Sequence, residues 1–243
     1  MLRWAGHSYQ KPKYRLCFNF TGRDRLPPSL HDRHNTSGNW NWPLNPVGIR
    51  VSKTQVRPDS AVEDLRLVRE FQAGSERAFN ELVLKHRQGV FLTASGMLSS
   101  RDDAEDITQE VFIKAYQSLG GFRGESALYT WLYRITINLC LNHIRKRKVR
   151  SSFGLEQVQA VLPEADRADS DLEISELSLK ARTAIAGLPE KQRAVFILRH
   201  FRGLPHAEIA RIMERDEGTI KANYFQAVRK LRDKLGPYLQ GKE

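Results

Sequence analysis

The stretch Leu204–Leu235, LPHAEIARIMERDEGTIKANYFQAVRKLRDKL, decides the fold of the C-terminal part of the chain. Its apolar spacing predicts a first helix from His206 to Met213, in which the small Ala210 permits a close helix crossing. A second helix is expected to begin after Arg215, with Asp216 as its N-cap. Two helices joined by such a short turn are typical of a helix-turn-helix.

The second helix of this motif has an inward and an outward set of side chains. Ile220, Val228 and Leu231 are expected to point inward, together with either Phe225 or Tyr224. The outer faces carry types that can contact phosphates or base edges, namely Thr219, Lys221, Asn223, Gln226, Arg229 and Lys230. The alternative is an ordinary helical hairpin with a solvated basic face, but spacing and polar donors together favour DNA recognition.

The amino-acid composition favours an anionic partner and argues against a membrane protein, a secreted protein and a metal-binding protein. The 243 residues carry a formal net charge of +11, which is typical of proteins that bind a polyanion, and either nucleic acid or an anionic membrane would fit. Residues 1–60 hold ten Lys or Arg and three Asp or Glu, a net +7, so most of the charge lies in this segment. The prediction of DNA binding must therefore rest on clusters of basic residues in the rest of the chain. No apolar run predicts a membrane span or a signal peptide. Cys17 and Cys140 lack metal-ligand spacing, so no metal and no cofactor is expected.

The chain divides into four segments by pattern and charge. Residues 1–60 show no periodicity and are predicted to be a disordered extension or a mis-assigned translation start. Helical periodicity fills 61–149, where Ser100 or Asp102 is the expected N-cap of one helix. Residues 150–178 are predicted to be a flexible acidic linker. A second helical domain follows at 179–237, with its last helix closed by Gly236 and Pro237. The predicted fold class is therefore all-α, with two small helical domains.

The stretch FRGESALYTWLYRITINLCLNHIRKRK, residues 122–148, combines a polar loop, aromatic side chains and a block of positive charge. A helix is expected from about Ala127 to Lys148, with an inward stripe formed by Leu132, Ile135, Leu139 and Ile144. The aromatic rings of Tyr129, Trp131 and Tyr133 cannot all join this stripe. Rings beside cations resemble a platform for single-stranded nucleic acid. The alternative is that one or two rings belong to the core and the basic block is a solvated helix end.

These motifs resemble the bacterial RNA polymerase sigma factors of the extracytoplasmic-function (ECF) group. DDAEDITQEVFIKAY, FRGESALYTWLYRITIN and LPEKQRAVFILRHFRGLPHAEIARIMERDEGTIKANYFQAVRKLR carry the resemblance, which covers about residues 62–148 and 177–236. It implies that the first domain binds the clamp helices of the largest polymerase subunit and opens the minus-ten element. The second domain would read the minus-thirty-five element as duplex. Such a subunit directs promoter-specific transcription initiation and is not itself an enzyme.

The resemblance also assigns roles to individual residues. The residues implied in polymerase binding are Asp103, Asp106, Gln109 and Glu110. Those implied at the minus-ten element are Phe122, Arg123, Trp131, Tyr133, Asn138, Arg145, Lys146, Arg147 and Lys148, with at least one of Trp131 and Tyr133 expected to be structural. The chain departs from the family pattern at Asn223-Tyr224-Phe225, where Arg is usual. This departure bears on which base pairs are read.

The implied partners are core RNA polymerase, promoter DNA in duplex and melted form, and an anti-sigma factor. The implied location is the cytoplasm, at the nucleoid with polymerase or at the membrane with an anti-sigma factor, and the implied setting is a stress response. One rival is a conventional helix-turn-helix regulator, which predicts a receiver or ligand domain. Another is a sigma mimic that sequesters an anti-sigma factor; Asn138 and the basic block from Arg145 to Lys148 argue against it.

Overall fold

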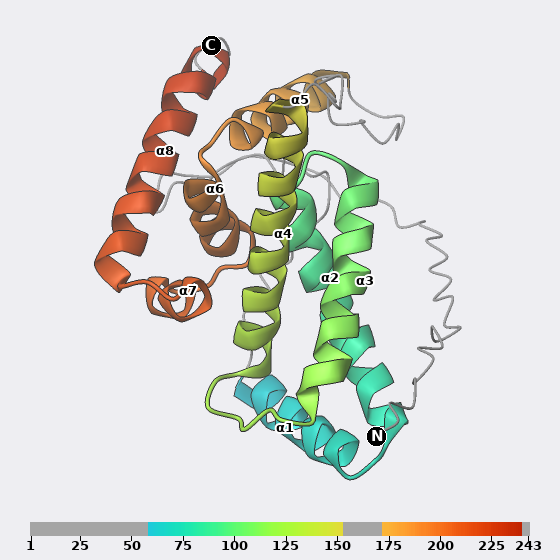
Figure 1. The fold of residues 1–243 in the computed structure, drawn as a ribbon. Coiled ribbons are helices and arrows are strands. Elements are labelled where there is room, and N and C mark those ends of the chain that lie inside the picture. The colour runs from blue at the N-terminus through green and yellow to red at the C-terminus, as the bar shows by residue number, and fades with distance from the viewer. Residues whose placement is uncertain (1–57, 153–171, 240–243) are drawn as a thin grey trace, which may run out of the picture. The chain divides into compact units, whose positions relative to one another are not determined.

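A computed structural model describes residues 58–152 and 172–239, and within these ranges every regular element is helical (Figure 1). The predicted all-α fold class is confirmed. Residues 1–57 and 153–171 lie outside the described residues, so the extension and most of the predicted linker lie there too. The domain boundaries remain a prediction.

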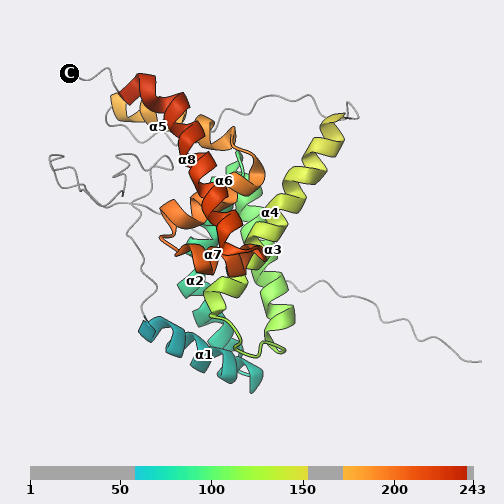
Figure 2. The same cartoon turned by 90° about the vertical axis from the view of Figure 1, so that its left-hand side faces the viewer.

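The first four helices form one bundle. They are α1 (Pro58–Gln72), α2 (Glu76–Met97), α3 (Arg101–Leu119) and α4 (Leu128–Ser152). In both views α2, α3 and α4 run alongside one another, and α1 crosses one end of them (Figures 1 and 2). Ser75 caps α2, and the Ser100 hydroxyl caps α3 by accepting from the Asp103 backbone N–H at 3.2 Å. Of the two expected N-caps of α3, the structure uses Ser100.

Apolar side chains of different sizes fill the centre of this bundle. Val90, Ala94, Met97, Val111 and Cys140 are each at most 1% exposed. Burial raises the pKa of the Cys140 thiol to about 12, so the thiol stays protonated and serves packing rather than reactivity.

The inward face of α4 is rotated relative to the predicted stripe. The structure buries Leu132 as expected, but Ile135, Leu139 and Ile144 are only partly buried. The fully buried positions are Leu128, Thr130, Leu132, Tyr133, Thr136, Ile137 and Cys140. Thr136 can be buried because its hydroxyl donates to the Leu132 carbonyl at 2.8 Å. The predicted stripe therefore does pack against the core, but the most buried face of α4 also includes Tyr133, Thr136 and Cys140, which the prediction left out.

A buried carboxylate ties α1 to α2. Asp64 is 1% exposed, and its Oδ1 lies 2.6 Å from Lys85 Nζ and 3.0 Å from His86 Nε2. Burial alone would raise the pKa of Asp64, but the hydrogen bonds and charges of His86 and Lys85 outweigh it and hold the pKa below its usual value. The group is therefore a charged link inside the bundle.

The remaining helices are α5 (Leu172–Ala186), α6 (Glu190–Phe196), the π-helical turn η1 (Ile197–Phe201), α7 (His206–Met213) and α8 (Glu217–Leu239). The predicted bounds of α7 are confirmed, and so is the Asp216 cap, whose Oδ1 accepts from the Thr219 backbone N–H at 2.7 Å. Between α7 and α8 the chain turns at Glu214, which has left-handed backbone angles of φ 52° and ψ 50°.

Two expectations for the ends of this region differ from the structure. Helix α5 begins at Leu172, inside the segment predicted as linker, because an acidic composition does not exclude a helix and Glu is a good helix former. Helix α8 continues through Gly236 and Pro237 to Leu239. Pro237 lies in the last turn, so it removes only one intrahelical hydrogen bond there.

Two apolar clusters organise the packing of these helices. One joins α5, α6 and α8 and includes Ala181, Phe196 and Leu231. The other contains Ile209 and Ile212 of α7 together with side chains of α2, α3 and α4. Gly96 of α2 permits a close approach, since a Cβ added there would lie 3.0 Å from Ile197 Cδ1. The sequence pattern did not predict this contact between elements distant in the chain.

Candidate functional site

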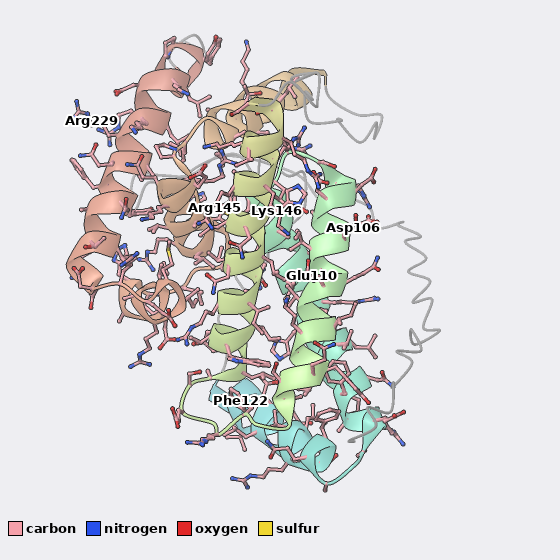
Figure 3. The ribbon with its side chains drawn as sticks, viewed as in Figure 1. Asp106, Glu110, Phe122, Arg145, Lys146 and Arg229 are labelled. Atoms are coloured by element: carbon pink, nitrogen blue, oxygen red, sulfur yellow. The ribbon has the colours of Figure 1, made fainter. Side chains whose placement is uncertain are left out.

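The outer face of α3 presents a row of acidic and amide side chains. Asp106, Gln109 and Glu110 are exposed, and Figure 3 shows Asp106 and Glu110 on the same helix. Asp103 is different: it is partly buried, and its Oδ2 lies 3.4 Å from His143 Nε2 and 3.7 Å from Arg147 Nη1. Three of the four expected polymerase-binding residues are thus displayed, and the fourth is engaged with α4.

Sequence reasoning missed two apolar side chains that continue along α3. Ile113 is 57% exposed and Tyr116 is 46% exposed. The Tyr116 ring packs edge-on against Phe71 and Phe79, with centroid distances of 5.3 and 5.0 Å. Ile113 and Tyr116 follow Gln109 by four and seven residues, and this helical spacing could have placed them on the same face of α3.

The loop before α4 is held in place from α1. Gln72 Nε2 donates to the backbone carbonyls of Phe122 and Leu119, at 3.0 and 3.1 Å. The Phe122 ring packs on Trp131 at a centroid distance of 5.4 Å, and both are partly buried. Arg123, the next residue, is exposed. This loop therefore has a fixed aromatic base and a free cationic edge.

Tyr133 is the structural member of the aromatic set. Its side chain is 6% exposed, and its hydroxyl accepts from Arg202 Nε at 2.9 Å. Burial raises the pKa of Tyr133, which keeps the hydroxyl protonated. Gly89 makes room for this pair, since a Cβ there would lie 2.7 Å from the Tyr133 hydroxyl and 2.8 Å from Arg202 Nη2.

From Asn138 onward, α4 exposes several polar and basic side chains. Asn138, Arg145 and Lys146 are exposed, and Figure 3 shows Arg145 and Lys146 on α4. Arg147 is partly buried beside Asp103, and Lys148 forms an ion pair with Glu190 of α6. Three of the four cations of the predicted basic block are therefore exposed, and two of the four, Arg147 and Lys148, have carboxylate partners.

The N-terminal half of α4 is bonded to the segment from Arg202 to Glu214. The Thr130 hydroxyl donates to Glu208 Oε2 at 3.0 Å. Arg134 donates from Nη2 to the Arg211 carbonyl at 2.9 Å, and its Nη1 lies 3.1 Å from Glu214 Oε1. Sequence reasoning found none of these contacts, because they join residues more than sixty positions apart.

Helix α8 displays most of its predicted DNA-facing residues. Gln226 and Arg229 are exposed, and Figure 3 shows Arg229 on the side of α8 away from α4. Lys221 is exposed and pairs with Glu217 at 2.9 Å. Asn223 and Lys230 are partly buried, and Asn223 Nδ2 donates to the Thr219 carbonyl at 2.9 Å.

Two positions of α8 refine the sequence reading. The exposed Thr219 also serves the cap, because its hydroxyl donates to Asp216 Oδ2 at 2.6 Å. Of the pair left open, Tyr224 packs inward, stacked on Phe196 at 6.4 Å, and Phe225 is 65% exposed.

These surfaces define a protein that works by binding. In the described ranges, no group of three or more His, Cys, Asp or Glu side chains could hold a metal ion. None of the helices described there is long and apolar enough to cross a membrane. An acidic helix face, a basic aromatic helix and a helix-turn-helix together are typical of a transcription protein that binds DNA and a large protein partner.

Comparison with known proteins defines the family. Residues 82–150 match Sigma-70 region 2, and residues 178–231 match Sigma-70, region 4. The RNA polymerase sigma-H factor of Pseudomonas aeruginosa is 37% identical over 186 residues, which cover 73% of this chain and 96% of that protein. The ECF RNA polymerase sigma-E factor of Escherichia coli K12 is 35% identical over 185 residues, with the same coverage. The chain belongs to the ECF sigma factors of bacterial RNA polymerase.

Solved structures agree with this assignment. The sigma factor RpoE of Bartonella quintana, solved with the anti-sigma factor NepR, has a TM-score of 0.54 and 27% identity, covering 65% of this chain and 96% of that one. CnrH, solved with the cytosolic domain of CnrY, also has a TM-score of 0.54 but 20% identity, and it shows the shared fold alone.

Family membership confirms the function expected from the sequence. The protein binds core RNA polymerase and DNA and directs transcription initiation through regions 2 and 4. It is a non-enzymatic subunit, and its place among the ECF sigma factors is typical of a stress response.

Proposed function

We propose that three exposed surfaces of this sigma factor divide its work. In this proposal α3 binds core polymerase through Asp103, Asp106, Gln109 and Glu110. The observation that carries it is the exposure of three of these four side chains on one helix face, a polar surface that suits a basic partner. The charge of Asp103 would reach the partner only after it leaves His143 and Arg147.

The minus-ten surface in this proposal is the loop at Phe122 and the helix α4. Exposed Arg123, Asn138, Arg145 and Lys146 would contact the separated strand and its backbone. Trp131 and Phe122 would form the apolar wall of a pocket for an extruded base, because their rings already pack together. Tyr133 would serve this surface indirectly, by joining α4 to Arg202. Arg147 and Lys148 would contact DNA after exchanging their carboxylate partners.

The minus-thirty-five surface is the outer side of α8. Thr219, Lys221, Asn223, Gln226, Arg229 and Lys230 would contact duplex DNA there. The Asp216 cap supports this role, since it fixes the start of a helix whose first turns enter a major groove in helix-turn-helix proteins. Basic side chains on this helix would contact phosphates, and Gln226 would be available to a base edge.

The partner that masks these surfaces is proposed to be an anti-sigma factor. The support is the relative from Bartonella quintana, which was solved bound to one. Such a partner would hold the protein in the cytoplasm, or at the membrane if it is membrane-bound itself. Release would let the protein join polymerase at the nucleoid.

The polymerase-binding face can be tested by charge reversal. Asp106→Lys and Glu110→Lys should each weaken competition for core polymerase several-fold, because a cation would then face a basic surface. The loss should shrink as salt is raised, since screening weakens exposed charge pairs. Glu76→Lys is the control, a charge reversal at an exposed position on α2, outside the proposed face of α3. Competition equal to that of the control would assign α3 to another partner.

A further inference from the structure

Phe225 is a large apolar side chain on the outer side of α8. It is 65% exposed and belongs to neither apolar cluster of the described residues. Its neighbour Tyr224 occupies the inward position and stacks on Phe196. The fold therefore places the Tyr224 ring inside and leaves the Phe225 ring outside.

The side chains around Phe225 form a face with a distinct chemistry. Helical spacing places Lys221, Ala222 and Arg229 next to Phe225, and all three are exposed. Gly218 lies two turns before Phe225 on the same side and is also exposed. Since Gly218 and Ala222 project almost nothing, the ring stands out from a flat centre, and the two cations flank it.

This face matches one surface of duplex DNA. Cations at its sides suit phosphates, and a flat centre permits a close approach of the helix to the floor of a groove. A phenyl ring has no donor or acceptor, so it can read only an apolar group. The apolar group that the bases present in the major groove is the 5-methyl of thymine.

From this geometry we infer that Phe225, together with Ala222, reads a thymine of the minus-thirty-five element by contact with its 5-methyl group. The inference rests on the proposed role of α8 in duplex recognition and adds the base that it selects.

The test removes the methyl group and nothing else from the DNA. Holoenzyme made from the full chain and core polymerase first selects promoters from a genomic library by transcription in vitro. In one selected promoter, each thymine of the minus-thirty-five element is then replaced singly by deoxyuridine, which keeps the base pair but lacks the methyl. Binding of wild-type, Phe225→Ala and Phe225→Leu holoenzymes is measured for every duplex.

Wild-type holoenzyme should lose about fourfold in affinity at one thymine position, the factor expected from one buried methyl group. Phe225→Ala should bind the thymine and deoxyuridine duplexes equally at that position, and Phe225→Leu should retain part of the preference. The matched control is Leu84→Ala, which truncates a side chain of similar exposure, 64%, on α2 and should leave the deoxyuridine profile unchanged.

Two outcomes would overturn the inference while leaving α8 as the duplex reader. One is a deoxyuridine profile in which no position distinguishes wild type from Phe225→Ala. The other is a Phe225→Ala protein that loses affinity for core polymerase but keeps its promoter preference, which would make the ring a protein contact. Failure of the proposed duplex role would look different: the wild type would then show no minus-thirty-five preference at all.

Discussion

Helices α4 and α8 are both long and basic, but they differ in what surrounds them. The 25-residue α4 is packed on one side and bonded on another, through Thr130, Tyr133 and Arg134, to the segment from Arg202 to Glu214. The 23-residue α8 is packed only along its inward side and leaves its outer side displayed. A basic helix in the sequence therefore does not by itself say which surface is free to bind DNA.

This difference fits the two kinds of DNA that the helices are proposed to contact. A duplex is rigid, and a helix whose whole outer side is displayed can enter its groove without rearrangement. A melted strand is flexible and needs a support for separated bases, which packing around Trp131 and Phe122 supplies. In this proposal the side chains packed around α4 take part in binding the strand, whereas those packed against α8 only hold the helix in place.

The largest effect should come from the inward side of α8. Leu231 is fully buried, so Leu231→Ala should reduce the free energy of unfolding by about 2–5 kcal/mol, through lost burial and a cavity. Phe225→Ala on the outer side should change it by no more than about 0.5 kcal/mol. Urea unfolding followed by circular dichroism gives both values. Equal losses would mean that the two sides of α8 are not as different as described.

A smaller effect is expected at the buried link of α4. Tyr133→Phe deletes the hydroxyl that accepts from Arg202, which should lower the free energy of unfolding by about 1.5 kcal/mol. Tyr238→Phe makes the same chemical change on the exposed end of α8 and should have almost no effect. Promoter opening is followed in the same variants by permanganate reactivity. A Tyr133→Phe protein of normal stability that cannot open the promoter would place this hydroxyl on DNA.

The exposed cations of α4 and α8 should differ in which DNA they bind, and the salt dependence of binding distinguishes them. Each duplex phosphate contact contributes about 0.9 to the slope of log affinity against log salt, and each single-strand contact about 0.7. Arg229→Gln should reduce the slope for duplex promoter DNA only, and Arg145→Gln with Lys146→Gln should reduce it for a minus-ten single strand only. Fluorescence anisotropy of holoenzyme with each DNA gives the slopes. Reduction of both slopes by either change would remove the distinction between the helices.

The smallest expected effect is a difference in acid sensitivity between the segment formed by α6 and η1 and the pair of helices α1 and α2. Burial lowers the pKa of His200 of η1, so the folded state favours the neutral ring and loses stability as the pH falls below the ordinary histidine value of about 6.5. Asp64 has a lowered pKa, because His86 and Lys85 outweigh burial, and its contribution is lost only in stronger acid, as the carboxylate is protonated.

Amide hydrogen exchange measured from pH 7 down to about pH 2 tests this order, because the Asp64 carboxylate is protonated only below its ordinary range near pH 4. Protection in α6 and η1 should weaken first and protection in α1 and α2 later, and His200→Gln should flatten the first change. Simultaneous loss in both parts, unaffected by His200→Gln, would contradict the assignment.

Local signals in the sequence predicted much of the fold. The bounds of α7 and the Asp216 cap follow from spacing and capping chemistry, which act over a few residues. The inward set of α8 was predicted apart from the choice between Tyr224 and Phe225, which differ by one helical position and are both aromatic. The start of α5 was missed because charge was given more weight than helix propensity.

The surfaces were predicted less completely than the helices. Exposure of Asp106 and Asn138 follows from their place on amphipathic helices, and the structure displays both. The burial of Tyr133 depends on Arg202 and on the absent side chain of Gly89, which lie far from it in the sequence. Helical periodicity gives no information about partners so far apart in the sequence. Long-range polar pairs are therefore found only from the three-dimensional structure.

The turn at Glu214 links backbone strain to the contact with α4. A residue other than glycine in left-handed geometry costs about 1–2 kcal/mol, and a partly exposed ion pair such as that with Arg134 contributes less than about 1 kcal/mol. Glycine at this position would relax the turn and delete the pair. The substitution Glu214→Gly therefore offers protein engineers a way to loosen the helix-turn-helix from α4 without altering any residue proposed to touch DNA.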